Sequence, residues 1–365
     1  MKTFKEIFNS DSMVTTEAPG RVNLLGEHTD YNGGFVLPTA ISQKTRVQLG
    51  INDLNSFRLY STSLNKNITF NLVKPPRQHF ATYIYGCLKE VEALGIEIPF
   101  LDIFVSSNVP IGAGVSSSAA LEVATLRALR KLLNLSIDDV TIAKLAQQAE
   151  IKYAGVNCGI MDQMASSLAD TEHMLFMDTR SLEVKVLALP LDTEILIIDS
   201  GVSRTLANSK YNERREECNT AAQILRIKQL RNIIDPDVVE QLPTPLRERA
   251  RHVISENNRV LAASKEISAL DFGHLMNDSH ASLSVDYQVS IPQLDLLVNL
   301  LQNQNDVFGA KLTGAGFGGA CVALCKKNSS RSISKIVIER FNELGHHSRI
   351  IMPSNDYIAS GVNHH

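Results

Sequence analysis

The most informative segment of the sequence reads Val109-Pro-Ile-Gly-Ala-Gly-Val-Ser-Ser-Ser-Ala-Ala120, and a pattern typical of a long helix follows it. Gly112 and Gly114 allow the backbone to take positive φ angles and to come close to a ligand. The serines after them stand where the helix begins, and its unpaired N–H groups and dipole favour an anion there. The segment therefore predicts a phosphate-binding turn. The alternative is an ordinary serine cap after a glycine turn.

This turn is not a Walker A loop, because the sequence contains no Gly-Lys dipeptide. A second glycine-rich segment reads Lys311-Leu-Thr-Gly-Ala-Gly-Phe-Gly-Gly-Ala320, in which Gly314, Gly316 and Gly319 fit the pattern GxGxxG. A dinucleotide-binding fingerprint needs a helix directly afterwards, whereas the apolar run 320–325 predicts a strand. The pattern argues against a nicotinamide-dependent dehydrogenase. It favours a loop that closes over phosphates or substrate, with a plain hairpin turn as the alternative.

A third segment, from Ala18 to Gly34, is crowded with polar and charged side chains. Arg21, Glu27, His28 and Asp30 fall within ten residues, between glycine and proline residues. Such side chains are costly if they are buried without partners. They are useful toward a ligand with many hydroxyl groups, since carboxylates accept hydrogen bonds and histidine can donate them. The segment predicts either a pocket for such a ligand or a solvated polar loop.

The composition is that of an ordinary globular chain, which excludes a disordered, collagenous or coiled-coil protein. The 365 residues include 36 Lys+Arg against 39 Asp+Glu, and the formal charge of −3 argues against a dedicated nucleic-acid binder. No run approaches the roughly 20 apolar residues that span a bilayer, so we expect no membrane partner. The five cysteines form no CxxC pair and no zinc spacing. They predict reduced thiols in a cytoplasmic protein without a structural metal.

The order of predicted elements indicates the fold class. Short β-rich runs fill the first seventy residues, and the next hundred residues alternate helices with strands. Helices are predicted at about 80–94, 116–133, 137–153 and from near Gly159, and strands at 101–105, 173–178, 183–187 and 194–199. A largely helical stretch follows, and from Phe308 the order is strand, glycine loop, strand, helix, strand. This irregular alternation predicts an α+β architecture. The length favours two domains, residues 1–190 and 191–365, with the boundary near Pro190.

Together the three segments resemble the GHMP small-molecule kinase superfamily, named for galactokinase, homoserine kinase, mevalonate kinase and phosphomevalonate kinase. Within it the match is to the galactokinase family, whose signature is similar to Gly20-Arg-Val-Asn-Leu-Leu-Gly-Glu-His-Thr-Asp-Tyr-Asn32. Two more segments, Asn157-Cys-Gly-Ile-Met-Asp-Gln163 and Asn208-Ser-Lys-Tyr-Asn-Glu-Arg-Arg215, are similar to family segments in the same order. The resemblance covers essentially the whole chain.

The resemblance implies a two-domain GHMP kinase fold with the active site in the cleft between a mixed-sheet N-terminal domain and a C-terminal domain of helices and antiparallel sheet. The resemblance also admits a last strand that packs against the N-terminal domain. The implied activity is ATP-dependent phosphorylation of the anomeric hydroxyl of D-galactose. The implied site residues are Asp162 as catalytic base with Arg21 as its cationic partner; Glu27, His28, Asp30, Gly159 and Tyr211 around the sugar; Gly112, Ala113, Gly114, Val115, Ser116, Ser117 and Ser118 around the ATP phosphates; and Ser118 and Glu150 as ligands of Mg²⁺.

Several alternatives stay open at this stage. The substrate could be a related sugar, N-acetylgalactosamine or arabinose, since one sequence does not show which substituents the pocket accepts. A non-catalytic galactose sensor is disfavoured, because the serine motif is complete and Asp162 is present. Phe80 and Tyr83 are the nearest aromatic candidates for the adenine, with packing in a helix core as the alternative. We expect a monomer. The whole interpretation requires Asp162 and the serine-bearing turn to face each other.

Overall fold

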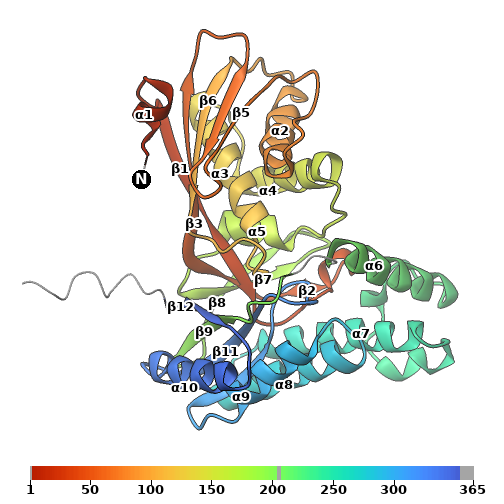
Figure 1. Cartoon of the computed structure of the whole chain (residues 1–365). Coiled ribbons are helices and arrows are strands. Elements are labelled where there is room, and N and C mark those ends of the chain that lie inside the picture. The colour runs from red at the N-terminus through yellow and green to blue at the C-terminus, as the bar shows by residue number, and fades with distance from the viewer. Residues whose placement is uncertain (1, 204–206, 354–365) are drawn as a thin grey trace, which may run out of the picture. The chain divides into compact units, whose positions relative to one another are not determined.

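The computed structural model of the chain describes residues 2–203 and 207–353. Contacts divide the chain into two compact units, whose elements are labelled in Figure 1. The first unit consists of Met1–Arg21, Gln43–Val109 and Ser116–Ala169, and the second of Val22–Ser42, Pro110–Val115 and Asp170–His365. Each unit is assembled from several separate segments of the chain, so this division does not test a single domain boundary. The boundary near Pro190 stays a prediction.

The first unit is a mixed sheet with helices, as the sequence predicts for the N-terminal half. Its strands are β1 (Val14–Asn23), β3 (Pro38–Ile51), β4 (Phe57–Ser61), β5 (Lys66–Phe70) and β6 (Leu101–Ser107). Its helices are α1 (Phe4–Phe8), α2 (His79–Glu92), α3 (Ser117–Leu132), α4 (Asp139–Ala149), the π-helical turn η2 (Glu150–Ala154) and α5 (Met161–Leu168). The strand order is β1-β3-β6-β4-β5. Strands β4 and β6 are parallel, whereas the β3–β6 and β4–β5 pairs are antiparallel.

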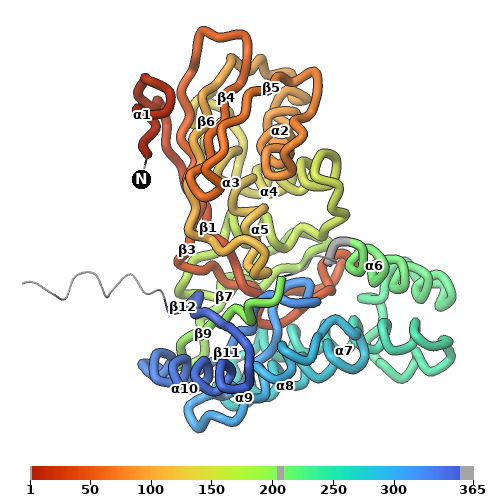
Figure 2. The backbone as a smooth tube through the Cα atoms, in the orientation of Figure 1, coloured from red at the N-terminus to blue at the C-terminus, as the bar shows by residue number. Residues whose placement is uncertain are grey.

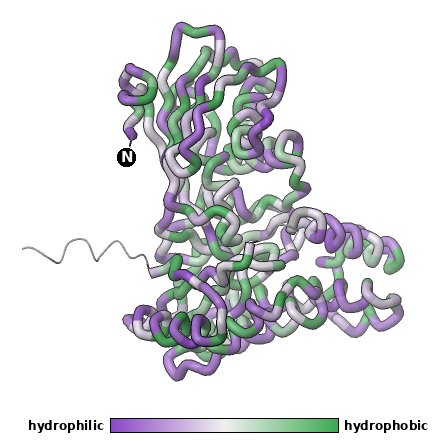
Figure 3. Tube along the Cα trace, in the orientation of Figure 1, coloured by the Kyte–Doolittle hydropathy of each residue, from purple (hydrophilic) through white to green (hydrophobic). Residues whose placement is uncertain are grey.

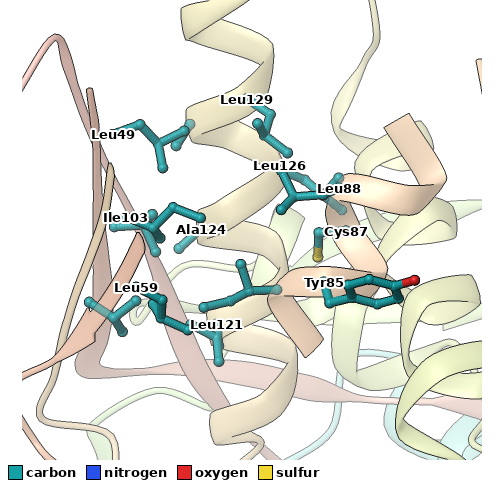
Figure 4. Close-up of a cluster of buried hydrophobic side chains, with 14 of the residues drawn as sticks. Leu49, Leu59, Tyr85, Cys87, Leu88, Ile103, Leu121, Ala124, Leu126 and Leu129 are labelled. Carbon is teal, nitrogen blue, oxygen red and sulfur yellow. The ribbon is translucent and has the colours of Figure 1, made fainter. Parts of the chain in front are cut away.

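The core of the first unit lies between the sheet and helices α2, α3 and α4, and Figure 4 shows part of it. Leu59 and Ile103 of the sheet join Leu121 of α3 in this core. Their neighbours Tyr60 and Phe104 point to the opposite face, because successive side chains of a strand alternate. There they pack against the aromatic residues of α1. The helices of the core therefore pack on one face of the sheet, and α1 packs on part of the other.

Two helices of this unit change geometry at candidate site residues. The predicted helix 137–153 is an α-helix only to Ala149 and continues as the π-helical turn, which begins at Glu150. Single π-turns inside helices occur frequently at functional sites. The helix predicted from near Gly159 begins at Met161, so Gly159 lies in the loop before it. The π-turn and the loop before α5 thus contain residues to which the resemblance gives a role.

The second unit combines helices with antiparallel sheets. Its strands are β2 (Phe35–Val36), β7 (His173–Asp178), β8 (Val184–Ala188), β9 (Thr193–Asp199), β10 (Val307–Leu312), β11 (Ala320–Lys326) and β12 (Arg349–Met352). Its helices are η1 (Asp30–Asn32), α6 (Ala207–Ile224), η3 (Leu230–Asn232), η4 (Pro236–Gln241), α7 (Leu246–Ala263), α8 (Ala269–Val285), α9 (Pro292–Gln302) and α10 (Ser330–Glu343). The predicted order of strand, glycine loop, strand, helix and strand after Phe308 is confirmed.

Strand β9, from the middle of the chain, pairs with both β11 and β12 from near its end (Figure 2). The resulting sheet has the order β10-β11-β9-β12, and a smaller sheet has the order β2-β7-β8. The last described strand therefore joins the sheet of the C-terminal half, and among the described residues no strand after it returns to the N-terminal half. The α+β class with a mixed sheet in one half and antiparallel sheets in the other is confirmed.

Helices of the second unit bury one face each. In α10, Ile333, Val337 and Phe341 recur every four residues and pack in the core, and Figure 3 shows hydrophobic and hydrophilic stretches alternating along this helix. This is the spacing that brings side chains to one face of a helix. None of the described helices is both long and apolar enough to cross a membrane.

Candidate active site

Asp162 lies in the first turn of α5, where Arg21 of strand β1 holds it with two hydrogen bonds. Arg21 Nε donates to Asp162 Oδ1 at 2.8 Å, and Nη2 donates to Oδ2 at 2.7 Å. Such a two-pronged ion pair fixes the carboxylate in direction as well as in place. The Asp162 side chain is 29% exposed and the Arg21 side chain only 5%. A reacting group can therefore reach the carboxylate from the solvent side, while the guanidinium stays behind it.

The serine-bearing turn contacts Asp162 directly. Ser116 has a φ of 59°, in the left-handed region, and its hydroxyl donates to Asp162 Oδ2. Its side chain makes no capping hydrogen bond to α3, so the interpretation of Ser116 as an ordinary helix cap is wrong. The hydrogen bond brings Asp162 and the serine-bearing turn together, and their joint role around a ligand stays a prediction. Because no serine side chain caps it, the N-terminal N–H groups of α3 are left for another acceptor.

Two further carboxylates lie behind Asp162 in the same unit. Glu122 of α3 and Glu150 are both buried, and Gln163 Nε2 donates to them at 3.3 Å and 2.6 Å. Burial raises the pKa of Glu150 to about 7, and the negative charge of Asp162 adds to the shift. Burial also raises the pKa of Glu122 far above its ordinary value, and the charge of Glu150 adds to it. Among the described residues neither Glu122 nor Glu150 forms an ion pair, and the raised pKa of each favours its protonated form.

Ser118 stands in the first turn of α3, where its hydroxyl acts to lower the pKa of Glu150 against the larger effect of burial. Cys158, in the loop before α5, donates to Glu150 at 3.7 Å through its thiol. Among the described residues no three His, Cys, Asp or Glu side chains form a ready metal site. A serine and one carboxylate are nevertheless a sufficient protein contribution for Mg²⁺, which keeps several waters and binds substrate phosphates.

The two glycine-rich segments meet within the second unit. Gly112 and Gly114 have φ angles of 79° and 80°, as predicted. A Cβ atom on Gly314 would lie only 2.7 Å from the carbonyl oxygen of Gly114. This contact and the positive φ of 80° explain why position 314 needs glycine, whereas at Gly114 the positive φ alone favours it. Ala113, Gly114 and Val115 are buried between them, while Gly112 is exposed.

The crowded polar segment forms a loop whose carboxylate is anchored by the second glycine-rich segment. Glu27 is buried, and its Oε1 accepts from Lys311 Nζ at 3.3 Å and from the backbone N–H of Gly314 at 2.7 Å. Lys311 is also buried and donates to the carbonyl oxygen of Asn23. The loop is therefore a built element, and the interpretation of this segment as a solvated polar loop is wrong.

Helix α7 holds the backbone of the same loop. Glu256 Oε1 accepts from Gly26 N at 2.8 Å, and Asn257 Oδ1 accepts from Phe35 N at 2.8 Å. One turn earlier, His252 Nε2 donates to the carbonyl oxygen of Glu27 at 3.1 Å. Burial lowers the pKa of His252 to about 4, so the ring is neutral and the proton lies on Nε2. Three side chains on one face of a helix thus fix the loop in place.

Three tyrosine rings of this unit lie close to the ring of His28. Its ring centroid lies 5.6 Å from that of Tyr211 in α6, 5.9 Å from that of Tyr31 and 4.8 Å from that of Tyr287. Asp30 opens the short helix η1 two residues after His28. The predicted sugar-pocket residues of the second unit, Glu27, His28, Asp30 and Tyr211, are therefore brought together. Gly159 belongs to the first unit, with the catalytic pair.

Sequence reasoning missed several residues that organise these groups. Glu122, His252, Glu256 and Tyr287 received no role, and Lys311 was noted only as the start of a motif. A signal was present for two of them, since His252 and Glu256 are spaced four apart and therefore share one face of a helix with apolar residues. Phe80 and Tyr83 pack at the margin of the first core. That finding agrees with the core-packing alternative and leaves their relation to adenine a prediction.

Comparisons with known proteins place these motifs in one family. The galactokinase galactose-binding signature matches residues 2–50, the GHMP kinases N terminal domain matches residues 82–170, and the GHMP kinases C terminal domain matches residues 260–343. The galactokinase of Roseiflexus sp. (strain RS-1) is 40% identical over 353 residues, which are 93% of this chain and 90% of the relative. The galactokinase of Thermosipho africanus (strain TCF52B) is 41% identical over 325 residues, 88% of this chain and 92% of the relative.

The structure leads to the same relatives. The crystal structure of Lactococcus lactis galactokinase complexed with galactose superposes with a TM-score of 0.88 at 32% identity, covering 95% of each chain. Mevalonate kinase from Methanococcus jannaschii superposes with a TM-score of 0.66 at 22% identity, covering 93% of this chain and 98% of the other. The second likeness concerns the fold alone.

Proposed function

Because this chain belongs to the galactokinase family of the GHMP kinases, we propose that it transfers the γ-phosphoryl group of ATP to the anomeric hydroxyl of D-galactose. The observation that carries the proposal is the arrangement of Asp162, which Arg21 and Ser116 hold at the start of α5. A carboxylate fixed in this way beside a phosphate-binding turn serves a reaction that removes a proton and moves a phosphoryl group. No observation favours N-acetylgalactosamine or arabinose over galactose.

In this mechanism Asp162 accepts the proton of the anomeric hydroxyl as the oxygen attacks phosphorus. A positioned base of this kind contributes about 10²–10⁴-fold to the rate. Arg21 stays on the buried side of the carboxylate and holds its direction through both hydrogen bonds. Its positive charge also offsets part of the charge that the transferred phosphoryl group brings.

We assign the ATP phosphates to the turn Gly112–Ser118. The support is the pair of positive φ angles at Gly112 and Gly114 and the N-terminus of α3, which its serine does not cap. The backbone N–H groups there are suited to phosphate oxygens. Ser117 and Ser118 add hydroxyl donors in the first turn of the helix.

We assign Mg²⁺ to Ser118 and Glu150. Burial, with the charge of Asp162 adding to it, raises the pKa of Glu150, and a divalent cation beside this carboxyl would favour its ionised form. When bound, Mg²⁺ neutralises phosphate charge and orients the leaving group. The hydroxyl of Ser118 and the carboxylate of Glu150 are hard oxygen donors, which suit this ion.

We assign the galactose hydroxyls to Glu27, His28, Asp30, Tyr211 and Gly159. The support for the first four is their common location in the second unit, where Lys311 and helix α7 hold the loop that carries them. Preformed hydrogen-bonding groups of this kind can reject a sugar that lacks one hydroxyl by about 10⁴–10⁵-fold. The pocket is therefore expected to be selective.

The test is a panel of sugars with ATP and Mg²⁺, scored by the initial rate of ADP release. Galactose is expected to give the highest kcat/KM, with a sugar-free reaction as the control for ATP hydrolysis. If another sugar is active and galactose is inert, the substrate assignment fails while the phosphate and metal assignments stand. If galactose binds without any ADP release, the chain is a sensor and the catalytic assignment fails.

A further inference from the structure

His28 is held in an unusual conformation. It has a φ of 64°, in the left-handed region that a non-glycine residue rarely takes, and only 3% of the residue is exposed. A backbone in this region costs roughly 1–3 kcal/mol and persists only where its surroundings impose it. The Asn32 side chain supplies part of that restraint, since Nδ2 donates to the His28 carbonyl oxygen at 3.0 Å. The His28 ring is restrained in addition by its contacts with Tyr31 and Tyr287.

A chain of hydrogen bonds leads from the His28 ring into the interior of the second unit. His28 Nδ1 lies 2.9 Å from the Tyr31 hydroxyl, and this hydroxyl lies 2.6 Å from that of Tyr287. The Tyr287 hydroxyl lies in turn 3.2 Å from Cys218 Sγ on α6. Each hydroxyl has only one proton to donate. The hydrogen bonds therefore all run from Cys218 toward His28, or all run from His28 toward Cys218. Which ring nitrogen of His28 carries the proton therefore depends on Tyr287 and Cys218, which lie further along this chain of hydrogen bonds.

Tyr287 is the best-fixed member of this hydrogen-bonded chain. It is fully buried two residues after α8, and its ring packs against those of His28 and His252. Two buried arginines hold its backbone. Arg214 Nε donates to the Tyr287 carbonyl oxygen at 2.8 Å, and Arg249 Nη1 donates to that of Asp286.

The two arginines share one acceptor, which makes the anchor a single network. Glu217 Oε2 accepts from Arg214 Nη1 and from Arg249 Nε, both at 2.9 Å. Arg214 belongs to the segment 208–215 that is similar to a family segment. This segment therefore supplies both Tyr211 and an arginine that holds the backbone of Tyr287. A rigid anchor at one end of a hydrogen-bonded chain restricts the group at the other end.

We propose that Tyr287 is a positioning residue of the sugar pocket, which acts through Tyr31 to fix the ring orientation and proton position of His28. This inference rests on the proposed function, because it takes His28 as a galactose ligand. With Nδ1 engaged in the hydrogen-bonded chain, the ring meets the sugar through Nε2. Tyr287 itself does not contact the sugar in this assignment.

The first test replaces the two tyrosines with phenylalanine. Tyr287→Phe removes one hydroxyl and keeps the ring, and we expect the KM for galactose to rise about 3- to 10-fold. The kcat and the KM for ATP are expected to stay within about twofold, since the phosphate turn is not involved. Tyr31→Phe breaks the same hydrogen-bonded chain closer to His28. The double variant is therefore expected to be no worse than Tyr31→Phe alone, because coupled groups are not additive.

Tyr85→Phe is the matched control. Tyr85 is a buried tyrosine of the first unit whose hydroxyl donates one hydrogen bond, to the Leu72 carbonyl oxygen. A general loss of stability from removing a buried hydroxyl affects it as much as Tyr287→Phe. An unchanged KM for galactose in Tyr287→Phe, or fully additive effects in the double variant, overturns the proposal.

The second test reads His28 directly and does not depend on turnover. In protein with ¹⁵N-labelled histidine, the His28 ring signals are assigned by their loss in His28→Gln. We expect one tautomer in the wild type and a mixture in Tyr287→Phe. Identical His28 ring shifts in both overturn the proposal even if galactose is the substrate. If galactose proves inert, the proposed function fails, and this measurement still decides whether Tyr287 positions His28.

Discussion

Glu150 in the first unit and Glu256 in the second are both buried carboxylates, yet their surroundings shift their pKa values in opposite directions. Burial raises the pKa of Glu150 to about 7, with the charge of Asp162 adding to the shift. Burial also acts to raise the pKa of Glu256, but the charges of Arg259 and Lys311 overcome it and lower the value to about 2. Glu150 has no ion-pair partner among the described residues, whereas the charges of Arg259 and Lys311 offset that of Glu256.

This difference matches what each unit is proposed to do. A site for a cation and phosphates gains from carboxylates that lack a fixed partner, because the ligand supplies the compensation. A sugar pocket gains from groups that are already held, because fewer of them must be ordered on binding. Glu256 accepts from Arg259 Nε at 2.6 Å, from Gly26 N and from Ser279 Oγ, and so acts as a fixed support for the loop.

The largest effect is expected from Asp162→Asn. Asparagine keeps the shape of the side chain and cannot accept a proton as the carboxylate does, so kcat should fall about 10²–10⁴-fold. The Kd for ATP, measured by calorimetry, should stay nearly unchanged because the phosphate turn is intact. Asp53→Asn, at an exposed position, is the control. Turnover near the wild-type value would remove Asp162 from the role of base.

The next effect in size concerns stability. Glu256→Gln leaves Arg259 without its carboxylate and weakens the support of Gly26, and we expect the free energy of unfolding to fall by about 3–5 kcal/mol. Urea unfolding measures this loss. Glu266→Gln, the same exchange at an exposed position after α7, should change little. A stable Glu256→Gln variant would show that the second unit does not depend on compensated charge.

The two units should also respond to pH in opposite ways. In the second unit, burial lowers the pKa of His252 from 6.5 to about 4, so its stabilising contribution is present above pH 6.5 and is lost as the pH falls toward 4. In the first unit, the pKa of Glu150 is raised from 4.5 to about 7, so its contribution is present below pH 4.5 and is lost as the pH rises through 7.

Urea unfolding with EDTA, from pH 5 to 8, tests the Glu150 half of this contrast. The wild type should lose stability relative to Glu150→Gln as the pH rises, by up to about 1.4 kcal/mol per pH unit. The glutamine side chain of the variant has nothing to titrate, so the difference between the two proteins isolates this one group. A difference that is constant over the range, or that grows in the other direction, contradicts the raised pKa.

Much of this site was predictable from sequence because its chemistry lies in short segments. The glycine turns were placed by their spacing, and the positive φ angles of Gly112 and Gly114 follow from residue type. Asp162 and Arg21, 141 residues apart in the chain, were paired only through the resemblance. Local patterns also gave most helices and strands, including β7 with both of its bounds.

What could not be predicted depends on contacts between distant segments. Nothing near Glu256 in the sequence indicates that its carboxylate supports Gly26, and nothing near Tyr287 indicates a link to His28. The π-turn at Glu150 falls inside a predicted regular helix, because its side-chain pattern is that of a helix and only the backbone hydrogen bonds differ. The serine at 116 was open to two interpretations until its hydroxyl was seen to donate to Asp162.

The smallest effect on stability is expected at Glu122, which can be compared directly with Glu256. Glu122 and Glu256 are both 0% exposed, and the same exchange to glutamine can be made in each. Burial raises the pKa of Glu122 well above its ordinary value, which favours the protonated form, and glutamine resembles that form. Its Oε1 also has no hydrogen-bond partner among the described residues. We expect Glu122→Gln to leave the free energy of unfolding unchanged or to raise it by about 1 kcal/mol at pH 8.

Urea unfolding at pH 6 and pH 8 measures this difference, and any gain should be larger at pH 8, where the wild-type carboxyl is under more pressure to ionise. A loss of about 3 kcal/mol, of the size expected for a broken buried ion pair, would mean that Glu122 is ionised and compensated as Glu256 is. The carboxyl beside Glu150 would then already have a compensating charge, and the argument that assigns Mg²⁺ to Ser118 and Glu150 would lose its physical basis.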